Sequence, residues 1–228
     1  MAFSHGSRSR LNLRALPRFA GETLFAKLGR AVCEADCLPR KELYEAWEVA
    51  RRARRYFRGG RVIDLAAGHG LLAFVLLLLD DSSPCALCVD IRKPASASRL
   101  ASVLSQHWPR LAGRVQYLVQ PLATVQLTAD DLVVSAHACG PLTDEVLGLA
   151  ASARARLAVL PCCHNLATGD RGGLEGWIEG DLAIDAVRAL ALRARGYRLR
   201  TQLIPDTITP QNRLLLGEPL QARLPLQL

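Results

Sequence analysis

Lysine is scarce in this chain, and no apolar run is long enough to cross a membrane. Only three of the 228 residues are lysine, so arginine supplies nearly all of the positive charge. The main apolar run, residues 71–79, is nine residues long, whereas a membrane-spanning helix needs about 20. The first residues are rich in Arg and Ser and lack the apolar segment of a secretory signal. We therefore expect no signal peptide and no association with a membrane.

The cysteine content argues against a disulfide framework. The seven cysteines are an odd number, and half of all residues are hydrophobic. A chain with so large an apolar fraction builds a core without covalent cross-links, and unpaired thiols are typical of reducing compartments. We expect one cytoplasmic catalytic or binding domain with reduced thiols. The sequence carries no indication of oligomeric state.

The net charge of +8 is concentrated near the start of the chain. Residues 1–60 contain 13 Lys and Arg against 6 Asp and Glu, which leaves +7 of the total there. Guanidinium groups match phosphate oxygens in geometry, so this basic region indicates a nucleic-acid partner; an arginine-rich composition that only reflects GC-rich coding is the alternative. Five arginines near the end of the helix expected at 40–57 suit its dipole and are expected to face solvent: Arg51, Arg52, Arg54, Arg55 and Arg58.

Apolar runs alternate with amphipathic segments along the rest of the chain. We expect strands at 61–66, 85–90, 114–120, 131–138 and 156–163, and two more around a turn within 197–219. Helices are expected at about 20–35, 40–57, 71–79, 94–107, 142–153 and 178–195. Residues 1–18 contain few apolar residues and are expected to be disordered or loosely attached. This order predicts a basic helical extension, 1–58, and an α/β domain, 59–228, whose last two strands form an antiparallel hairpin.

The most informative segment is a glycine turn at residues 61–73, RVIDLAAGHGLLA. It combines a buried strand, two glycines and the start of an apolar helix. Gly68 and Gly70 permit a ligand to approach the backbone where a Cβ would collide, and the first turn of the helix offers free N–H groups. Asp90 ends the next apolar run, 26 positions after Asp64. A carboxylate at the tip of a second parallel strand is placed to accept hydrogen bonds from ribose hydroxyls.

This segment resembles the cofactor-binding opening of class I S-adenosylmethionine-dependent methyltransferases. The resemblance implies a Rossmann-like, seven-stranded α/β sheet with S-adenosyl-L-methionine as cofactor. The same glycine pattern also fits the dinucleotide-binding fingerprint, and an ordinary strand–turn–helix without a ligand remains open. An acid at position 64 and the lack of a Tyr-x-x-x-Lys pair favour the methyltransferase. The implied cofactor-binding residues are Asp64, Ala66, Gly68, Gly70, Asp90 and Gln120.

Unusual residues follow the fourth and fifth expected strands. The segments are SAHACG (135–140) and PCCH (161–164), and ligands of parallel sheets bind at the carboxyl ends of strands. The run AHACGPLTD (136–144), with CCH one strand later, resembles a group of methyltransferase domains that includes a eukaryotic tRNA 2′-O-methyltransferase. The resemblance implies methyl transfer to RNA, either tRNA or rRNA. The candidate catalytic residues are His137, Cys139, Cys162 and His164.

Three chemistries are open for these residues. In the first, His137 removes a proton from a hydroxyl or nitrogen nucleophile, oriented by Asp144 or His164. In the second, Cys162 or Cys163 adds to a pyrimidine as a thiolate and Cys139 is a second thiol, as in RNA cytosine-5 methyltransferases.

The third chemistry is a zinc site formed by Cys139, Cys162, Cys163 and His164. Adjacent cysteines rarely bind one ion together, so we expect no metal.

A small-molecule methyltransferase, a dinucleotide-dependent oxidoreductase and a non-catalytic cofactor-binding module are the alternative functions.

Overall fold

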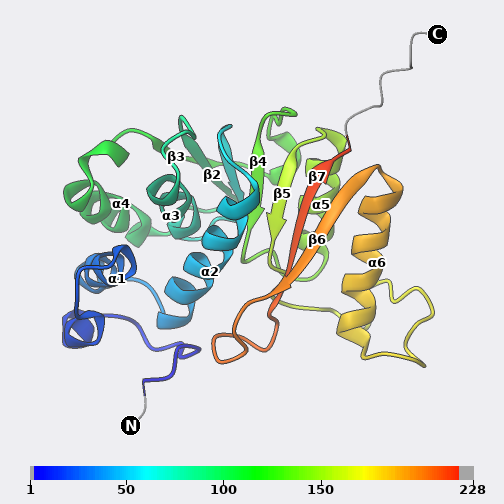
Figure 1. The fold of residues 1–228 in the computed structure, drawn as a ribbon, viewed down its shortest axis with the longest axis horizontal. Helices are drawn as coiled ribbons and strands as arrows, with labels where there is room; N and C mark the ends of the chain where they lie inside the picture. The colour runs from blue at the N-terminus through cyan, green and yellow to red at the C-terminus, as the bar shows by residue number, and fades with distance from the viewer. Residues whose placement is uncertain (1–2, 221–228) are drawn as a thin grey trace.

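The computed structural model describes residues 3–220 and contains one seven-stranded sheet (Figure 1). The strand order is β3-β2-β1-β4-β5-β7-β6. Strands β1 to β5 pair in parallel, and β7 runs antiparallel to both β5 and β6. The predicted fold, a Rossmann-like sheet that ends in an antiparallel hairpin, is confirmed. The strands are β1 (Val62–Leu65), β2 (Ala86–Asp90), β3 (Val115–Val119), β4 (Leu132–Ser135), β5 (Arg156–Val159), β6 (Tyr197–Leu203) and β7 (Arg213–Pro219).

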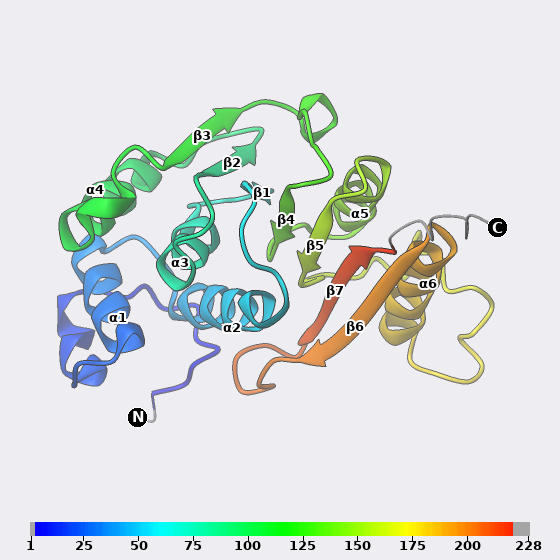
Figure 2. The ribbon, with the colours of Figure 1, turned by 45° about the horizontal axis from the view of Figure 1, so that its top comes forward.

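Helices cover both faces of the sheet (Figure 2). Side chains from α1 to α4 share one hydrophobic cluster, and α5 and α6 contribute to a second cluster on the other face. Neighbouring positions of β1 alternate between the two clusters, as the two-residue period of a strand requires: Val62 joins the first and Ile63 the second. No helix in residues 3–220 has the length and apolarity of a membrane span. The helices are α1 (Leu24–Ala35), α2 (Arg40–Tyr56), α3 (Leu71–Leu79), α4 (Ala95–His107), α5 (Pro141–Ser152) and α6 (Gly180–Ala194).

The N-terminal segment is ordered from residue 3, so the expectation of disorder in 1–18 is wrong for the described residues. Leu11 is 1% exposed, and its N–H donates to the carbonyl of Leu38 at 2.8 Å. The carbonyls of Ser7 and Ser9 accept hydrogen bonds from the first two residues of α2, each at 3.0 Å. These bonds tie a polar segment to a helix start, where backbone N–H groups lack partners. Residues 1 and 2 lie outside the described range.

The helices of the N-terminal region pack on the same core as the sheet. Buried side chains of α1 and α2 belong to the hydrophobic cluster that also contains Val62 and most of α3. The Phe19 ring lies against Gly29 of α1, at a position that a Cβ there would occupy. The domain boundary after residue 58 stays a prediction.

Arg54 is buried, which corrects the expectation that all five arginines of α2 face solvent. Its side chain is 3% exposed and lies 3.1 Å from the Asp80 carboxylate. The guanidinium also donates to the hydroxyl of Ser83 at 2.9 Å and to the carbonyl of Leu76 at 3.2 Å. Burial lowers the pKa of Arg54 to about 10. The five N–H donors of a guanidinium make this link between helix α2 and the end of α3 possible, where a lysine would leave some of the hydrogen bonds unmade.

Replacement of Arg54 by Met is expected to lower the free energy of unfolding by about 3 kcal/mol, because it removes the nearer and buried charge partner of Asp80 and leaves only the exposed Arg58 at 3.6 Å. Chemical denaturation followed by circular dichroism measures the change. Arg55→Met on the same turn is the control: Arg55 is exposed, and surface substitutions change stability by about 0.5 kcal/mol or less. Equal effects of the two substitutions would contradict the structural role of Arg54.

Candidate active site

The glycine turn between β1 and α3 is shaped by backbone that few side chains tolerate. Ala66, Gly68 and Gly70 all have positive φ, at 55°, 53° and 79°. A Cβ at position 70 would lie 2.8 Å from the Cys88 sulfur, so only glycine fits there. A Cβ at position 68 would meet nothing within 4 Å, which leaves the backbone of Gly68 beside open space. This turn provides room for a ligand at the carboxyl edge of the sheet.

Asp90 holds the glycine turn in place. Its Oδ2 accepts a hydrogen bond from the Gly68 N–H at 3.1 Å, and Oδ1 accepts one from the Arg92 N–H at 3.4 Å. The Tyr117 hydroxyl donates to the Gly68 carbonyl at 2.8 Å, a contact that sequence reasoning missed. The Gln120 N–H donates to the Asp90 carbonyl at 3.0 Å. Asp90 and Gln120, predicted at the ends of two separate strands, therefore lie side by side next to the turn.

Asp64 is buried with one oxygen unsatisfied. It is 2% exposed, and its Oδ2 has no hydrogen-bond partner in residues 3–220. Burial raises the pKa of Asp64 well above its ordinary value, and the nearby carboxylates of Glu42 and Asp90 add to the increase. Three acids thus crowd the glycine turn. A ligand with a positive ammonium and a positive sulfonium, as S-adenosylmethionine has, relieves this repulsion and supplies the missing donor, so these residues fit the implied cofactor.

The residues after β4 and β5 line one cavity of about 580 Å³. The structure brings His137, Cys162 and His164 together there, and the Cys139 sulfur lies 2.9 Å from that of Cys162. The first turn of α2 and the N-terminal segment form the opposite wall. We call this cavity the reaction pocket, and its lining residues are Arg8, Pro39, Lys41, Glu42, Glu45, His137, Cys162, Cys163, His164 and Gln211.

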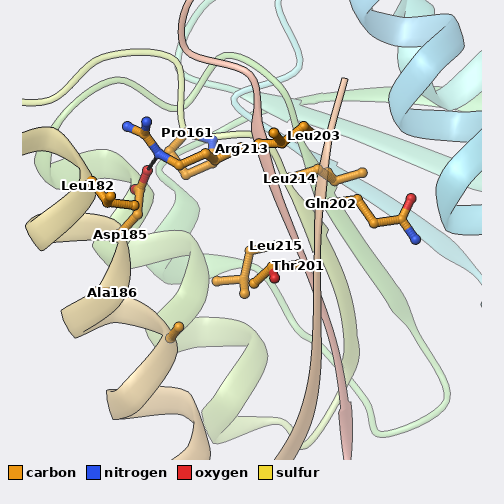
Figure 3. Close-up of a pocket in the computed structure, with 11 residues that line it drawn as sticks. Pro161, Leu182, Asp185, Ala186, Thr201, Gln202, Leu203, Arg213, Leu214 and Leu215 are labelled. Atoms are coloured by element: carbon orange, nitrogen blue, oxygen red, sulfur yellow. Dashed lines mark hydrogen bonds and ion pairs between the residues drawn. The ribbon is translucent and has the colours of Figure 1, made fainter. Parts of the chain in front are cut away.

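His164 is fixed by an acid on α6. Its Nε2 lies 2.8 Å from Asp185 Oδ1, and Asp185 Oδ2 accepts a hydrogen bond from Arg213 Nε at 2.6 Å. Although burial opposes ionisation, the hydrogen bonds from His164 and Arg213 lower the pKa of Asp185. Figure 3 shows the Asp185–Arg213 pair at one end of a second, largely apolar cavity of about 430 Å³ between α6 and the β6–β7 hairpin. Asp185 lines this second cavity and is bonded to His164, which lines the reaction pocket.

The expected orienting partners of His137 are engaged elsewhere. Asp144 accepts two hydrogen bonds from Arg188, at 2.7 and 2.9 Å, and His164 is bound to Asp185. Glu45 of α2 is an acid that interacts electrostatically with His137. Burial raises the pKa of Glu45, while Lys41 and His137 lower it. Glu45 is 3% exposed and was not found from the sequence, because the helix around it carries many other charges.

Cys139 and Cys162 lack the lowered pKa of an activated thiol. Burial raises the pKa of Cys139. Burial and the neighbouring thiols raise the pKa of Cys162 further. A nucleophilic cysteine needs a lowered pKa, because the thiolate is the reactive form. The raised pKa therefore disfavours Cys162 as the nucleophile of the covalent chemistry.

The family of this chain follows from comparison with known protein families. Residues 41–169, more than half of the chain, match a protein family described as a methyltransferase domain. The chain belongs to this family. Its cofactor is S-adenosylmethionine, as the resemblance of the glycine turn implied. No curated protein matches the chain.

Solved structures share the fold at low sequence identity. An O-methyltransferase family protein from Burkholderia thailandensis is 20% identical with a TM-score of 0.53, over 93% of this chain and 65% of that protein. The B. subtilis M1A22 tRNA methyltransferase TrmK is 16% identical (TM-score 0.51; 77% and 65% covered). The pyocyanin biosynthetic protein PhzM is 16% identical (TM-score 0.50; 91% and 61% covered). The chain thus spans less than two thirds of the length of each.

Proposed function

We propose that the protein transfers the methyl group of S-adenosylmethionine to RNA, with tRNA or rRNA as substrate. The observation that carries this proposal is a basic groove formed by the same N-terminal segment that contributes Arg8 to the reaction pocket. Arg8 lines the reaction pocket together with His137. Residues on both sides of Arg8, together with Arg40 of α2, line a groove of about 430 Å³ whose walls are Phe3, Ser4, Ser7, Ser9, Arg10, Asn12, Arg14, Ala15, Arg18 and Arg40.

The groove presents cations that are free to meet phosphate. Arg14 and Arg18 are exposed, and neither forms an ion pair with any residue of the described chain. The Arg40 guanidinium lies 3.6 Å from the centre of the Phe3 ring and donates to the Ser4 carbonyl at 2.8 Å. Arginines and hydroxyls are the usual partners of phosphate oxygens in nucleic-acid complexes. A polyanion bound along this groove would enter the reaction pocket past Arg8.

The groove is held in a fixed position by the rest of the fold. In Figures 1 and 2 the N-terminal segment (dark blue) lies between the start of α2 and the turn of the β6–β7 hairpin. Gly6 packs so closely on this turn that a Cβ would lie 2.7 Å from the Ile208 carbonyl oxygen. A preformed groove binds with a smaller loss of conformational entropy than a disordered arm.

His137 is the proposed general base. S-adenosylmethionine supplies a methyl group on a sulfonium. The imidazole of His137 takes the proton of the attacking hydroxyl, and Glu45 stabilises the resulting imidazolium by its negative charge. The Asp185–His164 pair closes one side of the pocket. The proton then passes from His137 to solvent before the next catalytic cycle.

A small-molecule substrate is the second candidate, and the apolar cavity of Figure 3 is the observation in its favour. This cavity borders Pro161, directly before Cys162, and contains Leu182 and Leu214. Apolar, concave sites of this kind suit small ligands. It contains only two charged residues, Asp185 and Arg213, which are paired with each other.

The double substitution Arg14→Ala/Arg18→Ala tests the RNA proposal. We expect affinity for an unmodified tRNA transcript to fall about tenfold near physiological salt. The slope of log K against log salt should become shallower by about 1.4, since each lost phosphate contact on a single strand removes about 0.7. Fluorescence anisotropy at several salt concentrations measures both quantities.

The matched control is Arg193→Ala/Arg195→Ala, which removes the same charge from exposed positions at the end of α6. We expect it to change affinity little. An equal loss in both double variants would mean that only net charge matters, and no loss in either would remove the groove from the proposal. Point substitutions are preferable to deletion of residues 1–58, because α2 supplies buried core residues.

A further inference from the structure

Three thiols from two loops converge at the reaction pocket. Cys139 lies between β4 and α5, and Cys162 and Cys163 lie directly after β5. The three Sγ atoms all lie within 4.8 Å of one another, and all three cysteines are free. Each is at least partly exposed. Nothing in the proposed methyl transfer uses three neighbouring thiols.

We propose that Cys139, Cys162 and Cys163 bind a soft divalent metal ion, with Zn²⁺ as the expected occupant. Zn–S bonds of about 2.3 Å at tetrahedral angles place two sulfurs about 3.8 Å apart. The observed Cys139–Cys162 separation of 2.9 Å and the 4.8 Å limit for the whole set bracket that distance. Small side-chain rotations are enough to form the site. This inference goes beyond the proposed function and does not depend on RNA as substrate.

Adjacent cysteines reach one ion here because the chain has left the strand. β5 ends at Val159, so the strict alternation of side chains between two faces no longer applies at residues 162 and 163. The two loops are also joined to each other. The Gly140 N–H donates to the Cys163 carbonyl at 3.1 Å, and Arg188 donates to the Gly140 carbonyl at 3.0 Å. These contacts hold the two loops, and with them the three cysteines, side by side.

The charge balance favours a cation. Three thiols lose three protons when they bind M²⁺: three S–H bonds break, three S–M bonds form, and the protons pass to solvent. The resulting site carries one net negative charge, beside a pocket that holds two cations, Arg8 and Lys41, and two acids, Glu42 and Glu45.

The fourth coordination position faces the pocket. Within residues 3–220, no further Cys, His, Asp or Glu belongs to the cluster. Sites with three protein ligands and one open position are typical of reactive rather than purely structural zinc. His164, the next residue along the chain, is already held by a carboxylate through Nε2, as histidines near metals commonly are. A water or a substrate oxygen would complete the site beside His137.

Cobalt titration of the full-length, phosphine-reduced protein tests this proposal. We expect one equivalent of Co²⁺ to produce thiolate-to-cobalt charge-transfer bands and the intense visible bands of tetrahedral cobalt, and one equivalent of Zn²⁺ to abolish them. Cys139→Ser, Cys162→Ser and Cys163→Ser should each weaken cobalt binding at least about tenfold, because a ligand is lost. Cys85→Ser is the matched control, since Cys85 lies at the opposite edge of the sheet, before β2.

Two further measurements guard against misfolding. Each variant is checked for S-adenosylhomocysteine binding by calorimetry. In the unaltered protein, Zn²⁺ should protect Cys139, Cys162 and Cys163 from iodoacetamide while the control thiol Cys85 is alkylated at an unchanged rate. A failure of RNA methylation would leave this result standing. The inference is overturned if reduced protein gives no cobalt bands, if the bands survive all three single substitutions, or if Zn²⁺ protects none of the three thiols.

Discussion

Replacement of His137 by Ala is expected to lower methyl transfer to RNA about 10²–10⁴-fold, the usual contribution of a positioned general base. S-adenosylhomocysteine binding should be retained, because the predicted cofactor contacts come from the glycine turn and from Asp90 on neighbouring strands. The measurement pairs two assays of the same preparation: incorporation of labelled methyl into total RNA, and calorimetric titration with S-adenosylhomocysteine. Loss of transfer with intact binding would separate a catalytic role from a structural one.

His107→Ala is the matched control for this experiment. His107 ends α4 and lies 2.7 Å from Glu34 at the surface, outside the residues that line the reaction pocket. We expect its transfer rate to equal that of the unaltered protein. An unchanged rate in His137→Ala would show that no imidazole at this position removes the proton. Binding without transfer in the unaltered protein, on RNA and small-molecule acceptors alike, would favour a non-catalytic cofactor-binding module.

The element order could be predicted because burial and periodicity agree along most of the chain. The helix predicted at 71–79 is α3, residue for residue. The strands predicted at 131–138 and 156–163 were too long, since β4 ends at Ser135 and β5 at Val159. Residues beyond these ends, such as Ala136 and Ala138, remain buried. Apolar composition reports burial, and the alanines on either side of His137 are buried although they lie beyond the strand.

Part of the candidate site followed from strand ends alone. Residues after neighbouring parallel strands meet at one edge of the sheet, and this rule placed His137 and Cys162 in one pocket. The rule says nothing about helices or side-chain partners. Glu45 reaches the pocket from α2, and Asp185 reaches His164 from α6. These contacts depend on how helices pack on the sheet, which no local pattern in a single sequence encodes.

The N-terminal segment shows that amino-acid composition alone does not predict whether a segment is ordered. Its composition is that of a disordered tail, yet Leu11 and Phe19 are buried and the backbone is bonded to α2. A short polar segment gains order when a few apolar side chains find an existing core and its backbone N–H and C=O groups find partners. Amino-acid composition measures neither the contacts with the core nor the backbone hydrogen bonds.

Replacement of Asp64 by Asn is expected to stabilise the cofactor-free protein at neutral pH and to weaken cofactor binding. The raised pKa of Asp64 means that folding opposes ionisation of this carboxyl. The stability of the neutral form is fully present below the unfolded value of about 3.9 and is lost as pH rises through the folded pKa. An amide does not ionise, so we expect the free energy of unfolding at pH 7 to rise by about 1–2 kcal/mol. This gain should vanish as the pH falls below about 4.

The same substitution should weaken S-adenosylhomocysteine binding ten- to hundredfold, because a hydrogen bond to a charged partner contributes about 1.5–3 kcal/mol. Urea denaturation at several pH values and calorimetry measure the two effects. Asp131→Asn is the control: Asp131 is equally buried but accepts two hydrogen bonds from Arg61, at 2.9 and 3.0 Å, so its loss should destabilise the protein. An Asp64→Asn protein that is less stable at pH 7, or that binds S-adenosylhomocysteine normally, would contradict the assignment of Asp64 as a cofactor-binding acid. The buried Asp64 carboxyl lowers the stability of the cofactor-free protein, and the same unpaired carboxyl attracts the positive group of the cofactor.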